Sequence, residues 1–242
     1  MRAVRWLALS IGILFLVGTA LQLVDTFNLY VSPPDTPAAN MVDQRLAAQD
    51  YRVAIWPVFF LNNFAFGVAF VAITGLGFAL LSSIERGDLR RVAVVLGLGV
   101  GGILGAVGQL ILLGATRVTI DIAYCDCGFK ETEIVSQIWA QMLANGASEA
   151  LVDAASLLAA IGVIAVGSGM RSRMPAGWEI VSWVTATALV LGTLLRFFSL
   201  GSEDLGTFLF VAISGVLVPI WSIWLAWSFR SEPRLEEPSA AA

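Results

Sequence analysis

Six long runs of apolar residues divide the chain, and shorter polar stretches separate them. The runs cover residues 6–24, 54–81, 92–116, 147–169, 178–200 and 205–228. A helix needs about 20 mostly apolar residues to cross the roughly 30 Å hydrocarbon core of a bilayer, and these runs meet that requirement. Strands of a membrane barrel would instead alternate apolar and polar residues in short segments. We therefore predict an all-α protein, a polytopic transmembrane bundle of six spans.

The connections between the runs predict a single transmembrane domain over residues 1–230. The first long connection, 25–51, begins with several prolines and continues into a helix-compatible stretch from Asn40 to Asp50, which we expect to fold over one face of the bundle. The second long connection, 117–145, has apolar residues at helical spacing, which fits either a short interfacial helix or an extension of the fourth span. The tail 231–242 is rich in Glu, Pro, Ser and Ala, and we predict it to be disordered.

Basic residues collect on one set of connections, and this pattern predicts the orientation. Nine of the fourteen lie there: Arg2, Arg5, Arg86, Arg90, Arg91, Arg171, Arg173, Arg230 and Arg234. Lys and Arg near span ends favour the cytoplasmic side. We therefore expect both termini to be cytoplasmic, with the two long connections outside.

The first run could also be a cleaved signal peptide, because Arg2 and Arg5 precede it and Gly18 and Ala20 offer a small-residue cleavage site. A signal peptide usually has an apolar core of about 7 to 15 residues. Here the apolar run continues to Val24. A retained first span is the better prediction.

Composition narrows the classes of function. Hydrophobic residues make up 58% of the chain and charged residues 13%, against about 25% charged in soluble domains. We expect a multi-pass protein of a bacterial inner membrane, with the bilayer as its main partner. The chain has no histidine, which removes the usual haem ligand, the commonest metal ligand and the commonest general base. We predict no cofactor, no metal and no catalytic residues, and enzyme is the least favoured class; the net charge of -4 also argues against nucleic acid.

Polar residues near the outer ends of the spans form one predicted layer. Asp153 lies 18 residues from Arg171, and Arg196 lies 18 residues from Trp178, so each sits about 27 Å above the inner end of its helix. The remaining members of the layer are Gln22, Asn62, Asn63, Gln109 and Glu149. One interpretation is an outward-facing pocket that binds a small solute or a lipid headgroup. The other is that these residues only mark the depth at which side chains reach water.

Within this layer we expect an ion pair between Arg196 and Asp153, joined by Glu149 one turn farther along the same helix. The equal depths of Arg196 and Asp153 make the contact geometrically feasible. In a partly dry environment, a paired arginine and carboxylate are favoured over two separate charges.

Cys125 and Cys127 lie in the second long connection and are the only cysteines of the chain. A bridge between cysteines this close in sequence is strained and easily reduced. A strained bridge or free thiols, a bridge to a partner, and capture of a soft metal such as Cu(I) all remain open. We expect no stoichiometric metal.

Small residues mark one face of the third span, where Gly97, Gly101 and Gly105 recur at four-residue spacing. Small residues let helix backbones approach closely in lipid. An internal packing face is the plainer interpretation, and a homodimer seam or a gating hinge is the alternative. In the sixth span Pro219 predicts a kink. The tryptophans that follow it, Trp221, Trp224 and Trp227, read as an aromatic belt at the inner interface.

Three segments resemble a family of small six-span bacterial membrane proteins grouped as a domain of unknown function. They are the opening residues 9–20, residues 174–178 before the fifth span, and residues 219–225 in the last span. The resemblance implies the six-span topology and no catalytic residues. We therefore expect either binding or transport at the outward-facing polar layer, or an accessory subunit that packs against a membrane protein partner through the third span and the second long connection.

Overall fold

The computed structural model describes residues 2–31, 41–84, 88–123, 131–172, 174–198 and 203–229. In these ranges the regular structure is helical, with no strand. Six of the described helical segments are long and apolar enough to cross a membrane, and they cover the residues Arg2–Thr26, Val53–Ser82, Leu89–Asp121, Trp139–Gly169, Trp178–Phe197 and Phe208–Ser228. The prediction of an all-α bundle with six spans is confirmed. The tail at 231–242 lies outside the described residues.

Four of the spans are built around a single long helix, and two change helix type along their length. The elements are α1 (Arg2–Thr26), α2 (Met41–Ala79) with the short turn η1 (Leu80–Ser82), α3 (Asp88–Val94), η2 (Val95–Val100), α4 (Gly101–Ala123), α5 (Glu131–Gly169), α6 (Trp178–Phe197), α7 (Glu203–Phe210), η3 (Val211–Leu217) and α8 (Val218–Ser228). η2 and η3 are wider, π-helical turns. The third span is thus α3, η2 and α4, and the sixth is α7, η3 and α8.

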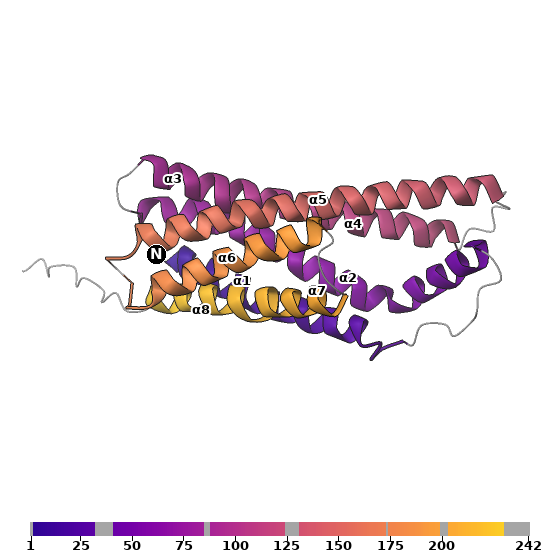
Figure 1. The fold of residues 1–242 in the computed structure, drawn as a ribbon, viewed down its shortest axis with the longest axis horizontal. Coiled ribbons are helices and arrows are strands. Elements are labelled where there is room, and N and C mark those ends of the chain that lie inside the picture. The colour runs from indigo at the N-terminus through magenta and orange to yellow at the C-terminus, as the bar shows by residue number, and fades with distance from the viewer. Residues whose placement is uncertain are drawn as a thin grey trace, which may run out of the picture.

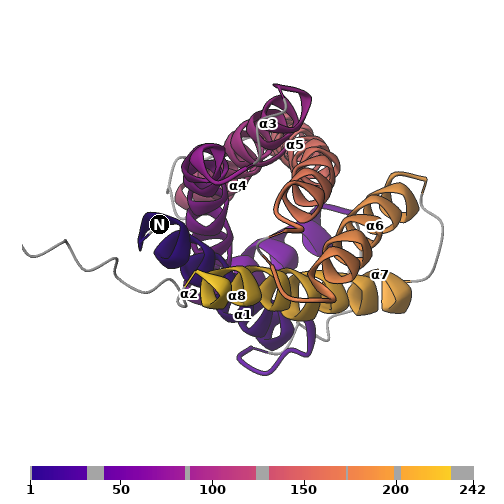
Figure 2. The ribbon, with the colours of Figure 1, turned by 90° about the vertical axis from the view of Figure 1, so that its left-hand side faces the viewer.

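The spans run nearly side by side along the long axis of the molecule (Figure 1). We call the end where α1 begins and α8 ends the terminal end, and the opposite end the loop end. Viewed along the axis, α5 and α6 lie on one side of the centre and α1 and α8 on another (Figure 2). Each span packs on its sequence neighbours, and α1 also packs on α8, which closes the bundle.

Two helices project beyond the rest of the bundle at the loop end (Figure 1). α2 starts at Met41 and runs without a break to Ala79. The stretch Asn40–Asp50 was expected to fold over the face of the bundle, and this is wrong from Met41 onward, because these residues continue the second span. α5 starts at Glu131, so the second long connection extends the fourth span rather than forming a separate interfacial helix.

Glycines bring the third span into direct contact with its neighbours. A Cβ at Gly97 would collide with the backbone of Gly162 in α5, and one at Gly101 would come within 3.1 Å of the carbonyl oxygen of Ala155. A Cβ at Gly105 would overlap the ring of Phe70 in α2. These three glycines therefore contact helices of the same chain, as an internal packing face requires.

The outer surface of the bundle is apolar along most of its length. Large side chains such as Trp6, Leu110, Ile180 and Phe208 are between 61% and 68% exposed. Soluble monomers rarely expose extended apolar surface, whereas lipid accepts it, and each helix satisfies its own backbone hydrogen bonds. The fold is that of a multi-pass membrane protein.

The sixth span is irregular just before Pro219. Proline lacks the N–H that would bond to the carbonyl four residues earlier, and its ring pushes against that carbonyl. The π-helical turn η3 occupies this position, at Val211–Leu217, and such turns often occur at functional sites. The predicted irregularity therefore takes the form of a wider turn, which faces the interior through Ser214, 5% exposed.

Candidate functional site

A cavity of about 540 Å³ lies inside the bundle. Its wall draws on every span, with Phe15 from α1, Phe70 from α2, Gln109 from α4, Ser156 from α5, Leu189 from α6 and Ser214 from η3 among the lining residues. Small-molecule sites in proteins typically enclose roughly 300 to 1,000 Å³. Its size is that of a ligand site.

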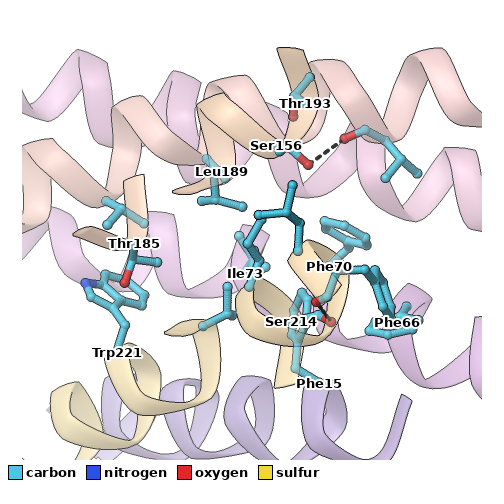
Figure 3. Close-up of a pocket in the computed structure, with 18 of the residues that line it drawn as sticks. Phe15, Phe66, Phe70, Ile73, Ser156, Thr185, Leu189, Thr193, Ser214 and Trp221 are labelled. Carbon is cyan, nitrogen blue, oxygen red and sulfur yellow. Dashed lines mark hydrogen bonds between the residues drawn. The ribbon is translucent and has the colours of Figure 1, made fainter. Parts of the chain in front are cut away.

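Aromatic side chains form one wall of this cavity. Phe15 meets Phe66 edge to face, with ring centroids 5.4 Å apart, and meets Phe70 in the same way at 6.0 Å. Phe210 in α7 continues the cluster, 5.9 Å from Phe66. Figure 3 shows Phe15, Phe66 and Phe70 gathered beside Ser214, with Leu189 across the cavity from them. Because the lining is mainly hydrocarbon and aromatic, it suits an apolar molecule.

α6 packs mainly on α5 and contacts the sixth span much less extensively. At the loop-end half it meets η3 where Gly192 faces Ile213, and a Cβ at Gly192 would lie 2.7 Å from the Ile213 Cδ1 atom. Towards the terminal end, Trp178 of α6 stacks on Trp221 of α8. Gly192, Ile213 and Trp221 all line the cavity.

The deep end of the cavity lies near the terminal end of the bundle, at Thr185 and Trp221 (Figure 3). Trp221 stacks on Trp178 with centroids 5.6 Å apart, and its Nε1 donates to Ser182 Oγ at 3.1 Å. Trp221 is 3% exposed, while Trp227 is 68% exposed. The interpretation of Trp221 as an interface residue is therefore wrong, because its indole is a buried part of the cavity floor.

Thr185 is the one fully buried lining residue at this end that carries a hydroxyl. Its side chain is 0% exposed, and Oγ1 has no hydrogen-bond partner among the described residues. An unmet buried hydroxyl costs about 1 to 3 kcal/mol. The deep end can therefore accept a polar atom as well as an apolar one.

We call the loop-end side of the cavity its mouth, because the lining residues there, Arg196, Leu205 and Gly206, are exposed. Leu195 and Arg196 line it from α6, and Leu205 and Gly206 from α7. A Cβ at Gly206 would meet nothing within 4 Å. Arg196 and Thr185 are eleven residues apart in α6, which corresponds to about 16 Å of helix. The cavity is thus elongated along the bundle axis.

Arg196 is ion-paired at this mouth. Its guanidinium nitrogen donates to Asp153 Oδ1 in α5, so the ion pair inferred from helix rise is present. The Asp153 side chain is 15% exposed and that of Arg196 is 52% exposed. Glu149 is exposed on α5 and attracts Arg196 electrostatically. The carboxylate of Asp153 therefore engages the arginine, whose side chain stays about half exposed.

Of the remaining residues of the predicted layer, Gln22, Asn62 and Asn63 do not line the cavity. Asn62 Nδ2 donates to Gln22 Oε1 across α1 and α2. Asn63 Nδ2 donates to the carbonyl oxygen of Phe59 in its own helix, at 2.8 Å. Of the seven layer residues, Gln109 and Arg196 line the cavity. The layer is therefore divided between the cavity mouth and the contact of α1 with α2.

A second polar group lies at the loop end of α1. Tyr51 donates to Asp25 Oδ1 at 3.2 Å and to Asn28 Oδ1 at 3.1 Å. Asn28 has the positive φ of 52° that asparagine tolerates. Partial burial, and then the charge of Asp25 and its hydrogen bond, raise the pKa of the Tyr51 phenol. Tyr51 therefore stays protonated and joins α2 to the end of α1.

An unfilled apolar space of this size would be costly. Voids in protein cores cost roughly 24 cal/mol per Å³, so sealing 540 Å³ without an occupant would cost on the order of 10 kcal/mol. That is comparable with the whole folding stability of a domain, about 5 to 15 kcal/mol. The cavity is therefore a space that favours an occupant.

The predictions on the cysteines and on metal are not resolved by this site. Cys125 and Cys127 fall outside the described residues, so their state stays a prediction. Among the residues that the structure describes, no group of three or more Cys, Asp or Glu side chains could hold a metal ion. The cavity offers an arginine, an amide and hydroxyls in an apolar enclosure, a combination found in ligand-binding sites.

The aromatic and hydroxyl lining was missed at the sequence level. Phe15, Phe66 and Phe70 lie within apolar runs, where nothing marks them apart from lipid-facing residues. A weak signal did exist for Thr185, Thr193 and Ser214, because each is a hydroxyl inside a span. Hydroxyls are common in membrane helices, where they can bond to their own backbone, so composition alone would not have selected these three.

In the comparisons with known proteins, no family model, no curated protein and no solved structure matches this chain.

Proposed function

We propose that this multi-pass membrane protein binds one amphipathic molecule from the bilayer, with the apolar body in the central cavity and the polar headgroup at the mouth near Arg196. One observation carries the proposal: an apolar cavity of about 540 Å³ that runs from Thr185 to a mouth lined by a paired arginine. The shape favours a chain-like body. The position of Arg196 favours a headgroup held at the membrane boundary.

The direction of the mouth follows from the basic residues. Arg2, Arg5, Arg90, Arg91 and Arg171 belong to helix ends at the terminal end. If that end is cytoplasmic, as the basic residues predict, the mouth opens toward the outer leaflet of a bacterial inner membrane. The proposal is therefore for an outward-facing site that takes a lipid-like molecule rather than a small, fully polar solute.

The alternative of an accessory subunit has less support. It relied on the glycines of the third span and on the second long connection as surfaces for a membrane protein partner. Those glycines already contact α5 and α2 of the same chain, as Gly97, Gly101 and Gly105 show. The cavity has no comparable explanation in a purely structural role.

Photolabelling tests the proposal. The protein is placed in lipid nanodiscs with twelve-carbon probes that carry a mid-chain diazirine and a hydroxyl, carboxylate or ammonium headgroup. We expect at least one probe to label cavity residues such as Phe70, Leu189 and Ile213 saturably, with loss of labelling on addition of the same unlabelled amphiphile. If no probe labels these residues saturably, the proposed function is wrong.

A matched pair of variants separates the cavity from the lipid-facing surface. Ala159 lines the cavity, whereas Ala20 is exposed on the outer side of α1. Ala159→Phe should abolish the saturable labelling by filling the space, and Ala20→Phe should preserve it. Equal labelling of the two variants would place the probe on the outside of the bundle.

A further inference from the structure

Two polar groups that line the cavity, Gln109 and Arg196, define what kind of headgroup it can hold. Gln109 in α4 is 9% exposed, and its Oε1 has no hydrogen-bond partner among the described residues. A carbonyl-type oxygen can only accept. Leaving it unmet costs about 1 to 3 kcal/mol, so a ligand gains by bringing a donor to it.

Arg196 has the opposite requirement. Its bond to Asp153 engages one guanidinium nitrogen, and an arginine has five N–H donors and no acceptor. The donors that remain at the mouth need an oxygen that accepts. The headgroup must therefore both donate, to Gln109, and accept, from Arg196.

Charge balance decides whether this headgroup is ionised. The cation of Arg196 is already compensated by Asp153, and Glu149 adds a second carboxylate nearby. An anionic headgroup would add a further negative charge to a site with no spare cation among the described residues, and like charges at close range disfavour each other. An ammonium headgroup could donate to Gln109, but it could not accept from Arg196 and would be repelled by it.

We infer that the ligand carries an uncharged hydroxyl headgroup, as in a long-chain alcohol or a monoacylglycerol, held between Gln109 and Arg196. A hydroxyl is both a donor and an acceptor, and it adds no charge. Asp153 is a positioning residue that orients Arg196 and cancels its charge. The inference rests on the proposed function, because it names the class of amphiphile that the cavity holds.

Competition for photolabelling tests the headgroup separately from the cavity. In nanodiscs, the label is competed with dodecan-1-ol, dodecyl methyl ether, dodecanoate and dodecylammonium, each expressed as mole fraction in the membrane. The ether accepts hydrogen bonds but cannot donate one. We expect the alcohol to compete about three- to tenfold better than the ether, the worth of one net hydrogen bond, and better than both ions.

Gln109→Leu should bring the alcohol and the ether to nearly equal potency. Gln141 supplies a matched control, since it also carries a buried amide nitrogen without a partner in the described residues but does not line the cavity. Gln141→Leu should leave the preference for the alcohol unchanged.

Asp153→Asn provides a second test that does not depend on Gln109. Without that carboxylate Arg196 loses its ion-pair partner and keeps only the attraction of Glu149, so dodecanoate should gain about tenfold relative to the alcohol. A residue with only a structural role would weaken all competitors alike.

The outcomes distinguish the two proposals. If all four amphiphiles compete equally, or dodecanoate is the best competitor of the unmodified protein, the hydroxyl headgroup is wrong while the cavity still binds. If no probe labels the cavity saturably, the proposed function falls, and the headgroup inference falls with it. If alcohol and ether compete equally in the unmodified protein, the role of Gln109 is wrong whatever its variant does.

Discussion

The contact of the third span with α5 and the region between α6 and the sixth span are built from different residues. In the first, Gly97 meets Gly162 so closely that either would collide with the other helix if it had a side chain. In the second, Leu189, Phe210 and Trp221 line the cavity, and Gly192 meets the side chain of Ile213 rather than a backbone. Glycine facing glycine lets two backbones touch, whereas large side chains line the space beside α6.

This difference shows how one bundle can be both stable and hollow. Lipid provides no hydrophobic effect between helices, so close backbone contact at small residues supplies much of the association. The glycine contacts hold the second, third and fourth spans close together. With the other spans they enclose a cavity, which an occupant can fill.

The largest loss of stability should come from adding a side chain where the third span meets α5. Gly97→Val would push a branched side chain into the backbone of Gly162, which cannot move aside as a flexible side chain can. We expect a loss of about 3 kcal/mol or more, seen as a large fall in melting temperature in detergent. Gly114→Val in α4 is the control, because a Cβ at Gly114 meets nothing within 4 Å. Equal melting temperatures of the two variants would contradict the tight packing.

Breaking the ion pair at the cavity mouth should have the next largest effect. Arg196→Leu strands the carboxylate of Asp153, which is 15% exposed. The half-exposed arginine reduces the cost below that of a fully buried pair, so we expect about 1 to 3 kcal/mol for either single change. Melting temperatures of Arg196→Leu, Asp153→Leu and the double variant check this. The double variant should be at least as stable as either single one, and strictly additive losses would argue against the pair.

Filling the cavity should have a smaller effect on the melting temperature, and of opposite sign to the effect of Gly97→Val. Ala159→Phe adds a large side chain to the cavity wall, where space exists. Burial of the added apolar surface should raise the melting temperature or leave it unchanged in the absence of added ligand. A fall in melting temperature as large as that of Gly97→Val would mean that the cavity wall is packed as tightly as the contact between the third span and α5.

The smallest effect concerns the polar group at the end of α1. Tyr51→Phe removes hydrogen bonds to Asp25 and Asn28 and should cost about 0.5 to 1 kcal/mol at neutral pH. The pKa of Tyr51 is raised in the folded protein, so its contribution is present below the ordinary tyrosine pKa of 10.0 and is lost as the pH rises through the folded value. Unfolding measured from pH 7 to pH 11 should show the difference between the two proteins shrinking at the alkaline end. A difference independent of pH would contradict this role of the phenol.

The spans were predictable from the sequence, because a bilayer demands about 20 apolar residues per helix and little else satisfies the backbone there. The pairing of Arg196 with Asp153 was predictable for a related reason. Helix rise fixes the depth of each residue, and opposite charges at the same depth attract each other in a partly dry environment. The π-helical turn before Pro219 was predictable only as an irregularity.

The cavity could not be predicted in the same way. The sequence does not separate residues that face lipid from residues that face an internal space, since both are apolar. Trp221 illustrates this, because its spacing with Trp224 and Trp227 fits an interfacial belt while its indole lies on the cavity floor. Equal depth likewise placed Gln22 and Asn62 in one predicted layer with Arg196. Their positions around the helix axes instead direct them toward each other, between α1 and α2.

The most direct test of the account is the stoichiometry of retained amphiphile. Native mass spectrometry of the protein released from nanodiscs containing dodecan-1-ol should show one bound alcohol per chain, which is lost in Ala159→Phe and kept in Ala20→Phe. Retention of the alcohol by Ala159→Phe at the same level as the unmodified protein would contradict the assignment of the central cavity as its binding site.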